Sequence, residues 1–152
     1  MPSECILVVD DDAAVNALNC EILQESGFRA LGVHCAATAF DTIDNGAGLS
    51  ALVTDVELGH GPDGFAVARR ARITNPEIPV LYVSGTAAAR YRSEGVERSE
   101  FLQKPFRPSE FVAALRRVLR HQTASSDIAA GEFNQESASL KADVLSMPDS
   151  SV

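Results

Sequence analysis

Polar side chains follow several short apolar runs in this sequence, at positions where they could do chemistry. They are Asp10, Asp11 and Asp12 after residues 5–9, Asp55 after residues 51–53, Ser84 after residues 80–83, and Lys104 after residues 101–103. Carboxylate oxygens bind hard cations, and an ammonium group or a hydroxyl can hold a charged oxygen. Taken alone, each residue also has an ordinary explanation. Asp12 is typical of a helix N-cap, Ser84 of a turn, and Lys104 of a solvated surface charge.

Asp55 is the residue that we expect to do the chemistry. Leu52 and Val53 indicate a strand buried on both faces, and Asp55 stands at its carboxyl end. In open parallel sheets, reactive groups lie just beyond these ends, which all emerge at one edge. The polar side chains are therefore expected to meet. Carboxylates held together repel one another unless a cation neutralises them, and an all-oxygen set of ligands selects Mg²⁺.

The elements that must position these residues alternate between strand and helix. Apolar runs predict strands at residues 5–9, 28–33, 51–55, 80–83 and 101–103. Helical periodicity predicts helices from residue 13 to a stop at Gly27, at 38–45, at 65–73 and from Pro108, with a weaker helix at 86–96. This alternation predicts an α/β fold with a doubly wound, five-stranded parallel sheet and right-handed crossovers.

The composition changes near Gln122. Residues 122–152 are rich in Ser, Ala and acidic residues and have few large apolar side chains. Such a segment cannot bury enough surface to offset the entropy lost on ordering, so we predict a disordered acidic tail. The predicted organisation is one folded domain at residues 1–121 followed by a tail at residues 122–152.

Composition and charge narrow the classes of function. The chain has 152 residues and a formal net charge of -8, which argues against nucleic acid as the main partner. No apolar run is long enough to cross a bilayer, and the N-terminus lacks the plan of a signal peptide. Cys5, Cys20 and Cys35 lie in apolar segments and indicate a reducing compartment. We therefore expect a cytoplasmic protein with no membrane partner.

The motifs, in this order and spacing, resemble the receiver domain of two-component response regulators over about residues 4–121. The segments that carry the resemblance are 8–12, 53–55, 63–64, 83–85 and 101–106. The residues at 81–85 and 101–106 are similar to receivers attached to hybrid histidine kinases. The resemblance implies a flavodoxin-like sheet with strand order 2-1-3-4-5. Because little chain follows the domain, it also implies a stand-alone regulator that signals through protein contacts.

The resemblance implies a role for each acidic residue. Asp55 would be the phosphoacceptor, taking a phosphoryl group from the histidine of a kinase or of a phosphotransfer protein. Asp10, Asp11, Asp55 and the backbone carbonyl of Glu57 would hold Mg²⁺. The chain would then be a stoichiometric phosphoacceptor and not an enzyme, although it would catalyse its own phosphorylation and dephosphorylation.

The resemblance also implies a switch. Lys104 would neutralise the phosphoryl oxygens, and the Lys104-Pro105 peptide would be cis. Ser84 would hydrogen-bond a phosphoryl oxygen, and Phe101 would swing inward behind it. The face made by the helix at 86–96, the fifth strand and the fifth helix would then contact a downstream protein or a second copy of the chain, with Tyr91 suited to that contact.

Two positions depart from the family pattern. Gly59 stands four residues after Asp55, where the family usually has Pro, and the loop to Asp63 is one residue longer than usual. Arg107 precedes Pro108, where Ser, Thr or Asp would be expected as the helix N-cap. Neither departure removes a group that the chemistry requires.

Two other interpretations stay open. Asp10 and Asp12 also resemble the first motif of haloacid-dehalogenase phosphatases, in which the first Asp is the nucleophile. Against this, Ala14 stands where that family has Thr or Val, and Asp55 would have no role. The second alternative is a receiver-shaped binding module that is never phosphorylated. The complete set of acids with Ser84 and Lys104 favours an active receiver.

Overall fold

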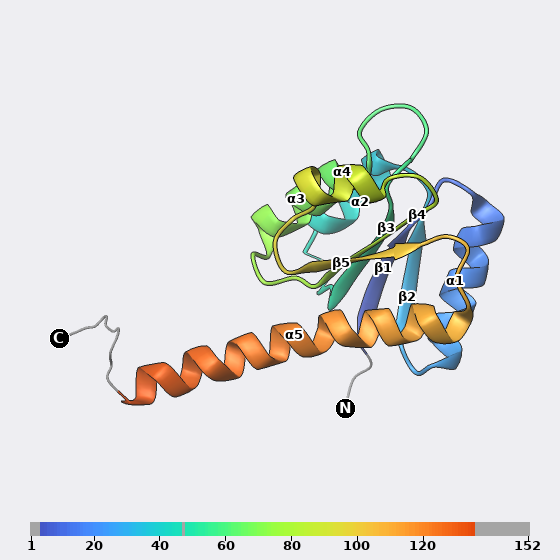
Figure 1. Cartoon of the computed structure of the whole chain (residues 1–152). Coiled ribbons are helices and arrows are strands. Elements are labelled where there is room, and N and C mark those ends of the chain that lie inside the picture. The colour runs from blue at the N-terminus through green and yellow to red at the C-terminus, as the bar shows by residue number, and fades with distance from the viewer. Residues whose placement is uncertain (1–3, 47, 136–152) are drawn as a thin grey trace. The chain divides into compact units, whose positions relative to one another are not determined.

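The computed structural model of the chain describes residues 4–46 and 48–135, with side chains described as far as His121. Within this range the strands pair in parallel in the order β2-β1-β3-β4-β5 (Figure 1). The predicted α/β fold, a doubly wound flavodoxin-like sheet, is therefore confirmed. The elements are β1 (Cys5–Val9), α1 (Ala13–Glu25), β2 (Arg29–Val33), α2 (Ala36–Asp44), β3 (Ala51–Asp55), α3 (Gly64–Thr74), β4 (Val80–Ser84), α4 (Ala88–Glu94), β5 (Ser99–Gln103) and α5 (Pro108–Gln135).

The three central strands are buried along their whole length, because they are predominantly apolar and only β3 and β4 have polar residues, at their carboxyl ends. Their side chains alternate between two faces of the sheet. Leu7 and Val9 pack against residues of α2 and α3, in what we call the α2–α3 core. Ile6 and Val8 pack against residues of α1 and α5, in the α1–α5 core. The sheet is thus fixed from both sides, and all its carboxyl ends emerge at one edge.

Two buried asparagines on α1 have opposite environments. Asn16 and Asn19 are each 3% exposed. The Asn16 Nδ2 donates to the carbonyl oxygens of Val8, at 3.1 Å, and Val33, at 2.9 Å, so it joins α1 to the ends of β1 and β2. No described residue accepts a hydrogen bond from the Asn19 Nδ2. Asn16 therefore helps to hold the site end of the sheet, whereas Asn19 is a buried donor without compensation.

Alanine at these two positions should have different effects on stability. Both substitutions remove the same atoms from the same helix and bring the same gain in helix propensity. Asn16→Ala also removes the two hydrogen bonds to backbone carbonyls, worth roughly 1 kcal/mol each, and a weaker one from the Cys20 thiol. We expect the free energy of unfolding in urea to be about 2 kcal/mol lower for Asn16→Ala than for Asn19→Ala. Equal losses would show that the hydrogen bonds of Asn16 do not stabilise the fold.

The last helix differs from the prediction. The chain divides into two compact units, Met1–Leu119 and Arg120–Val152, and α5 continues through Gln135. Residues 122–135 are thus helical, where a disordered tail was expected. The physical reason is that extending a helix already formed needs no new nucleation, and residues 122–130 contain no Gly or Pro. The rest of the predicted tail, residues 136–152, lies outside the described residues.

Among the described residues, no helix is both long enough and apolar enough to cross a bilayer.

Candidate functional site

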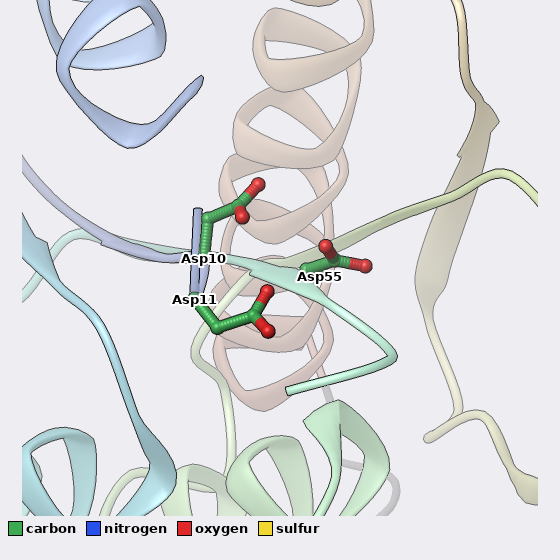
Figure 2. A group of neighbouring side chains, drawn as sticks. All are labelled: Asp10, Asp11 and Asp55. Atoms are coloured by element: carbon green, nitrogen blue, oxygen red, sulfur yellow. The ribbon is translucent and has the colours of Figure 1, made fainter. Parts of the chain in front are cut away.

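Three carboxylates meet where β1 and β3 end. Val9 pairs with Thr54, so Asp10 and Asp55 leave neighbouring strands at the same level. Asp10, Asp11 and Asp55 each place a carboxylate oxygen within 4.8 Å of the others, and Figure 2 shows these groups pointing toward a common space. Asp10 and Asp55 are buried, while Asp11 is exposed. The structure thus brings together the three acidic side chains that the sequence predicted as metal ligands.

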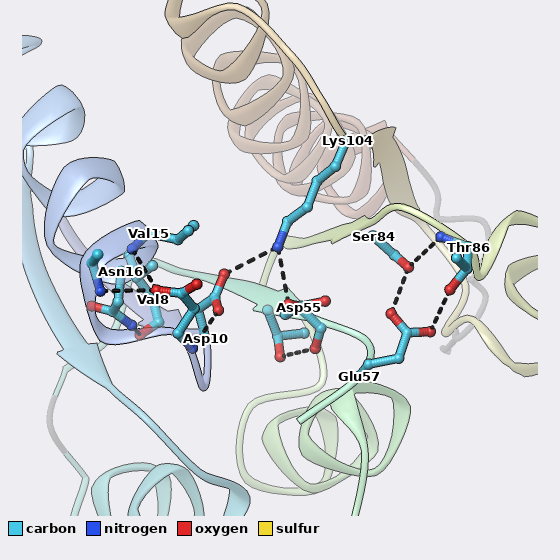
Figure 3. A network of polar contacts seen from close by, with 12 residues as sticks. Val8, Asp10, Val15, Asn16, Asp55, Glu57, Ser84, Thr86 and Lys104 are labelled. Carbon is cyan, nitrogen blue, oxygen red and sulfur yellow. Dashed lines mark hydrogen bonds and ion pairs between the residues drawn. The ribbon is translucent and has the colours of Figure 1, made fainter. Parts of the chain in front are cut away.

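Lys104 reaches this cluster from the segment after β5. Its Nζ lies 3.2 Å from Asp10 Oδ2 and 3.0 Å from Asp55 Oδ2 (Figure 3). Its backbone N–H donates to the Ser84 carbonyl at 2.9 Å, which holds the segment against the end of β4. The Lys104-Pro105 peptide is cis, as predicted. One ammonium among three carboxylates leaves the cluster negative and therefore open to a further cation.

Burial and neighbouring charges shift the pKa values of Asp55 and Lys104. Burial raises the pKa of Asp55 above its ordinary value, although the hydrogen bond from Lys104 acts in the opposite direction. Burial alone would lower the pKa of Lys104, but the hydrogen bond to Asp55 and the charges of Asp55 and Asp10 raise it overall. Lys104 therefore stays protonated and makes the ionised form of Asp55 less costly than burial alone would.

Asp12 is turned away from the cluster. Its Oδ1 accepts hydrogen bonds from the backbone N–H groups of Ala14, at 3.0 Å, and Val15, at 3.1 Å, so Asp12 caps α1. Its own N–H donates to Asp10 Oδ1 at 2.9 Å, which orients the Asp10 carboxylate. The N-cap prediction for Asp12 is confirmed. The phosphatase interpretation gains no support from Asp12, because its carboxylate is engaged in capping α1.

Ser84 and Glu57 form a second polar group beside the carboxylates. The Ser84 hydroxyl donates to Glu57 Oε1 at 2.8 Å, and the Thr86 hydroxyl donates to Glu57 Oε2 at 3.2 Å. The Ser84 Oγ also accepts from the N–H groups of Thr86 and Ala87, both at 3.1 Å. Among the described contacts none joins Ser84 to Asp55, so the structure does not bring Ser84 to the acceptor.

The contact through the Glu57 carboxylate is one that the sequence reasoning missed. Only the backbone carbonyl of Glu57 was assigned a role. The signal available was an acid two residues after Asp55, at the same sheet edge as a buried hydroxyl. That signal is weak, because neighbouring strand ends do not say which way a long side chain turns.

Phe101 belongs to a chain of aromatic rings on the α2–α3 core. Its ring stacks on Tyr91 with 5.4 Å between centroids, Tyr91 contacts Tyr82 at 5.6 Å, and Tyr82 contacts Phe65 at 5.0 Å. Burial raises the pKa of Tyr82 to about 12. The Tyr91 hydroxyl donates to the Ser99 carbonyl at 2.8 Å, so Tyr91 joins α4 to β5 and does not stand free for a partner.

The loop between β3 and α3 explains the departure at Gly59. Gly59 has φ of +78°, a conformation that Pro cannot adopt, and its Cβ position would lie 3.5 Å from Asp11 Oδ2. Asp63 ends the loop by capping α3 through the Ala66 N–H, at 3.0 Å, and by pairing with Arg90 of α4 at 2.7 Å. The longer loop is therefore anchored at its far end to both α3 and α4.

Comparison with known proteins agrees with this geometry. Residues 6–116 match the family described as the response regulator receiver domain. The chain is 32% identical over 124 residues to response regulator MprA of Mycobacterium avium (strain 104), covering 80% of this chain and 54% of that protein. It is 31% identical over 117 residues to the transcriptional regulatory protein CpxR of Escherichia coli (strain K12), covering 76% of this chain and 49% of that protein. The chain therefore spans about half the length of these relatives.

A solved structure has the same fold at a similar level of identity. The response regulator receiver protein from Sinorhizobium medicae WSM419 superposes with a TM-score of 0.77 and 34% identity, over 79% of this chain and 97% of that one. Matched over most of its described length by sequence and by structure, the chain belongs to the receiver domain family of two-component response regulators.

Proposed function

We propose that the chain accepts a phosphoryl group on Asp55 from the histidine of a kinase or of a phosphotransfer protein. The observation that carries this proposal is the placement of the Asp55 carboxylate beside Asp10, Asp11 and Lys104. A carboxylate oxygen of Asp55 attacks the phosphorus, the phosphorus–nitrogen bond to the donor imidazole breaks, and the electron pair of that bond goes to the imidazole. The product is an aspartyl phosphate, with no other group consumed.

The three carboxylates suit Mg²⁺ as the cofactor. They offer only oxygen ligands, and their combined charge with Lys104 remains negative, which favours a hard divalent cation. Asp10, Asp11 and Asp55 would hold it, with the carbonyl of Glu57 as a further ligand. When bound, the ion neutralises charge on the transferred group. Lys104 supports the same charge from its own side, because its Nζ already lies within hydrogen-bond distance of Asp55.

In this proposal the chain is a stoichiometric phosphoacceptor, and its output passes through protein contacts. Movement of the Ser84 hydroxyl toward a phosphoryl group would withdraw it from the Thr86 and Ala87 N–H groups, at the start of α4. The aromatic contacts of Tyr91 would carry this change to β5. The face of α4, β5 and α5 would then bind a downstream protein or a second copy of the chain.

The test is incubation with a small-molecule phosphodonor and Mg²⁺, followed by intact mass and peptide mapping. We expect one phosphoryl group per chain, dependent on Mg²⁺, located on Asp55 and labile to hydroxylamine as an acyl phosphate. A label on Asp10 with repeated turnover would contradict the proposal and support the phosphatase alternative. A chain that binds Mg²⁺ but stays unmodified would instead be a receiver-shaped binding module.

A further inference from the structure

The Ser84 hydroxyl has no capacity left in this structure. A serine hydroxyl has one proton to donate and two lone pairs to accept with. The proton goes to Glu57 Oε1 at 2.8 Å, and the oxygen accepts from the N–H groups of Thr86 and Ala87 at 3.1 Å each. The Ser84 residue is fully buried, so water does not supply an alternative partner. Ser84 can donate to a phosphoryl oxygen only after its hydrogen bond to Glu57 is broken.

The Glu57 carboxylate is well placed to compete for that proton. Its second oxygen accepts from the Thr86 hydroxyl at 3.2 Å, so one hydroxyl at the end of β4 and one just beyond it hold the carboxylate in place. A hydrogen bond to a carboxylate is stronger than one between neutral groups. Figure 3 shows Ser84 directed to Glu57, on one side, while Lys104 is directed to Asp55 and Asp10. The acceptor and its future hydroxyl partner thus belong to two separate hydrogen-bond groups.

We infer that Glu57 is a positioning residue that holds the Ser84 hydroxyl away from Asp55 in the unphosphorylated chain. This inference rests on the proposed function and adds to it the group that opposes the switch. Phosphorylation then exchanges one charged acceptor of the Ser84 proton, the Glu57 carboxylate, for another, the phosphoryl oxygen. The Thr86 hydroxyl, which donates to the other oxygen of Glu57, can keep its partner during this exchange.

The experiment measures the binding of beryllium trifluoride, a phosphoryl mimic, in the presence of Mg²⁺. Amide chemical shifts of residues 86–94 report the apparent affinity in the whole chain. We expect Glu57→Ala to bind the mimic about tenfold more tightly than the wild type, because no charged hydrogen bond has to be broken first. Without mimic or Mg²⁺, the Thr86 and Ala87 amide signals should already shift toward their positions in the mimic-bound protein.

A second comparison separates this competition from simple electrostatics. Removing any negative charge near Asp55 favours an anion, and Glu57 is such a charge. In a Ser84→Ala background the charge effect of Glu57→Ala remains, but the competition for the hydroxyl proton is gone. The gain in affinity should therefore be much smaller there. Glu25→Ala on α1 loses the same charge away from the site and should bind as the wild type does.

The outcomes distinguish the inference from the function on which it rests. Tighter binding by Glu57→Ala that depends on Ser84 supports the inference. If the wild type binds the mimic and Glu57→Ala binds it equally or more weakly, the inference is overturned. The contact between Glu57 and Ser84 would then be a structural one. An equal gain with and without Ser84 would also overturn it. A wild-type chain that does not bind the mimic at all would overturn the proposed function, and the inference with it.

Discussion

Replacing Lys104 by methionine is expected to slow phosphoryl acceptance from a small-molecule donor by about two orders of magnitude. Methionine has nearly the same length but no charge, so the Nζ contacts of 3.2 Å to Asp10 and 3.0 Å to Asp55 are lost while the packing is kept. The phosphoryl oxygens then meet three carboxylates without a protein cation. Stopped-flow or quenched mass measurements at saturating Mg²⁺ give the rate.

The same variant should have a characteristic pH dependence. The pKa of Asp55 is already raised by burial, and Lys104 opposes that shift, so Lys104→Met raises the pKa further. An acid with a raised folded-state pKa stabilises the fold below its unfolded-state pKa and loses that contribution as the pH rises. The melting temperatures of variant and wild type should therefore be close in acid and diverge from about pH 4 upward, the variant being the less stable.

A control variant separates the effect of the Lys104 charge at the site from the effect of a change in net charge. Arg116→Met on α5 loses one positive charge but has no contact with Asp55; its guanidinium lies 5.8 Å from the Phe28 ring centroid and 3.4 Å from the Ser26 carbonyl. Its phosphorylation rate should equal that of the wild type. If Lys104→Met also reacted at the wild-type rate, the assignment of Lys104 to the acceptor site would be wrong.

The second large effect is expected at Gly64, the first residue of α3. A Cβ there would lie 2.1 Å from the carbonyl oxygen of Asp55 and 2.9 Å from the Asp55 carbonyl carbon and from the Val56 Cα. These are backbone atoms of the strand that carries the acceptor, so they cannot turn aside as a side chain would. Gly64→Ala should lower the free energy of unfolding by about 2 kcal/mol, even after the gain in helix propensity.

Gly64→Ala should lower the melting temperature by roughly 5–10 °C and slow phosphoryl acceptance as well, because Asp55 must shift. Gly85→Ala is the matched control. A Cβ at Gly85 meets nothing within 4 Å, so the same added methyl group should leave the melting temperature unchanged or slightly higher. Equal melting curves for Gly64→Ala and the wild type would show that the backbones of β3 and α3 can separate without cost.

The sequence predicted the fold and the acid cluster for one physical reason. β1, β3 and β4 each begin as an apolar run, and parallel strands place their carboxyl ends at one edge. Asp10, Asp55 and Lys104 meet because of that topology, without any detail of side-chain conformation. The order of apolar and polar residues encodes this backbone topology, and that order can be seen in a single sequence.

The features that the sequence did not predict are mostly contacts in which a side chain chooses one of several possible hydrogen-bond partners. The Glu57 carboxylate turned to Ser84, 27 residues away, is such a case. Arg107 is another: it is a poor N-cap, but its N–H donates to Glu110 Oε1 at 2.7 Å, so an acid inside α5 supplies part of the cap. Composition alone does not predict the extension of α5 to Gln135, because the extension depends on the helix that precedes it.

The two cores on opposite faces of the sheet differ in which helices they fasten to it. Phe101, Tyr91 and Tyr82, which connect α4 to the sheet, all lie on the α2–α3 core. Phe111 and Leu115 of α5 lie in the α1–α5 core, separated from them by the sheet. Substitutions confined to the α1–α5 core should therefore leave the aromatic contacts of α4 in place. An engineer could strengthen the α1–α5 core to raise the melting temperature while leaving the contacts between α4 and the sheet as they are.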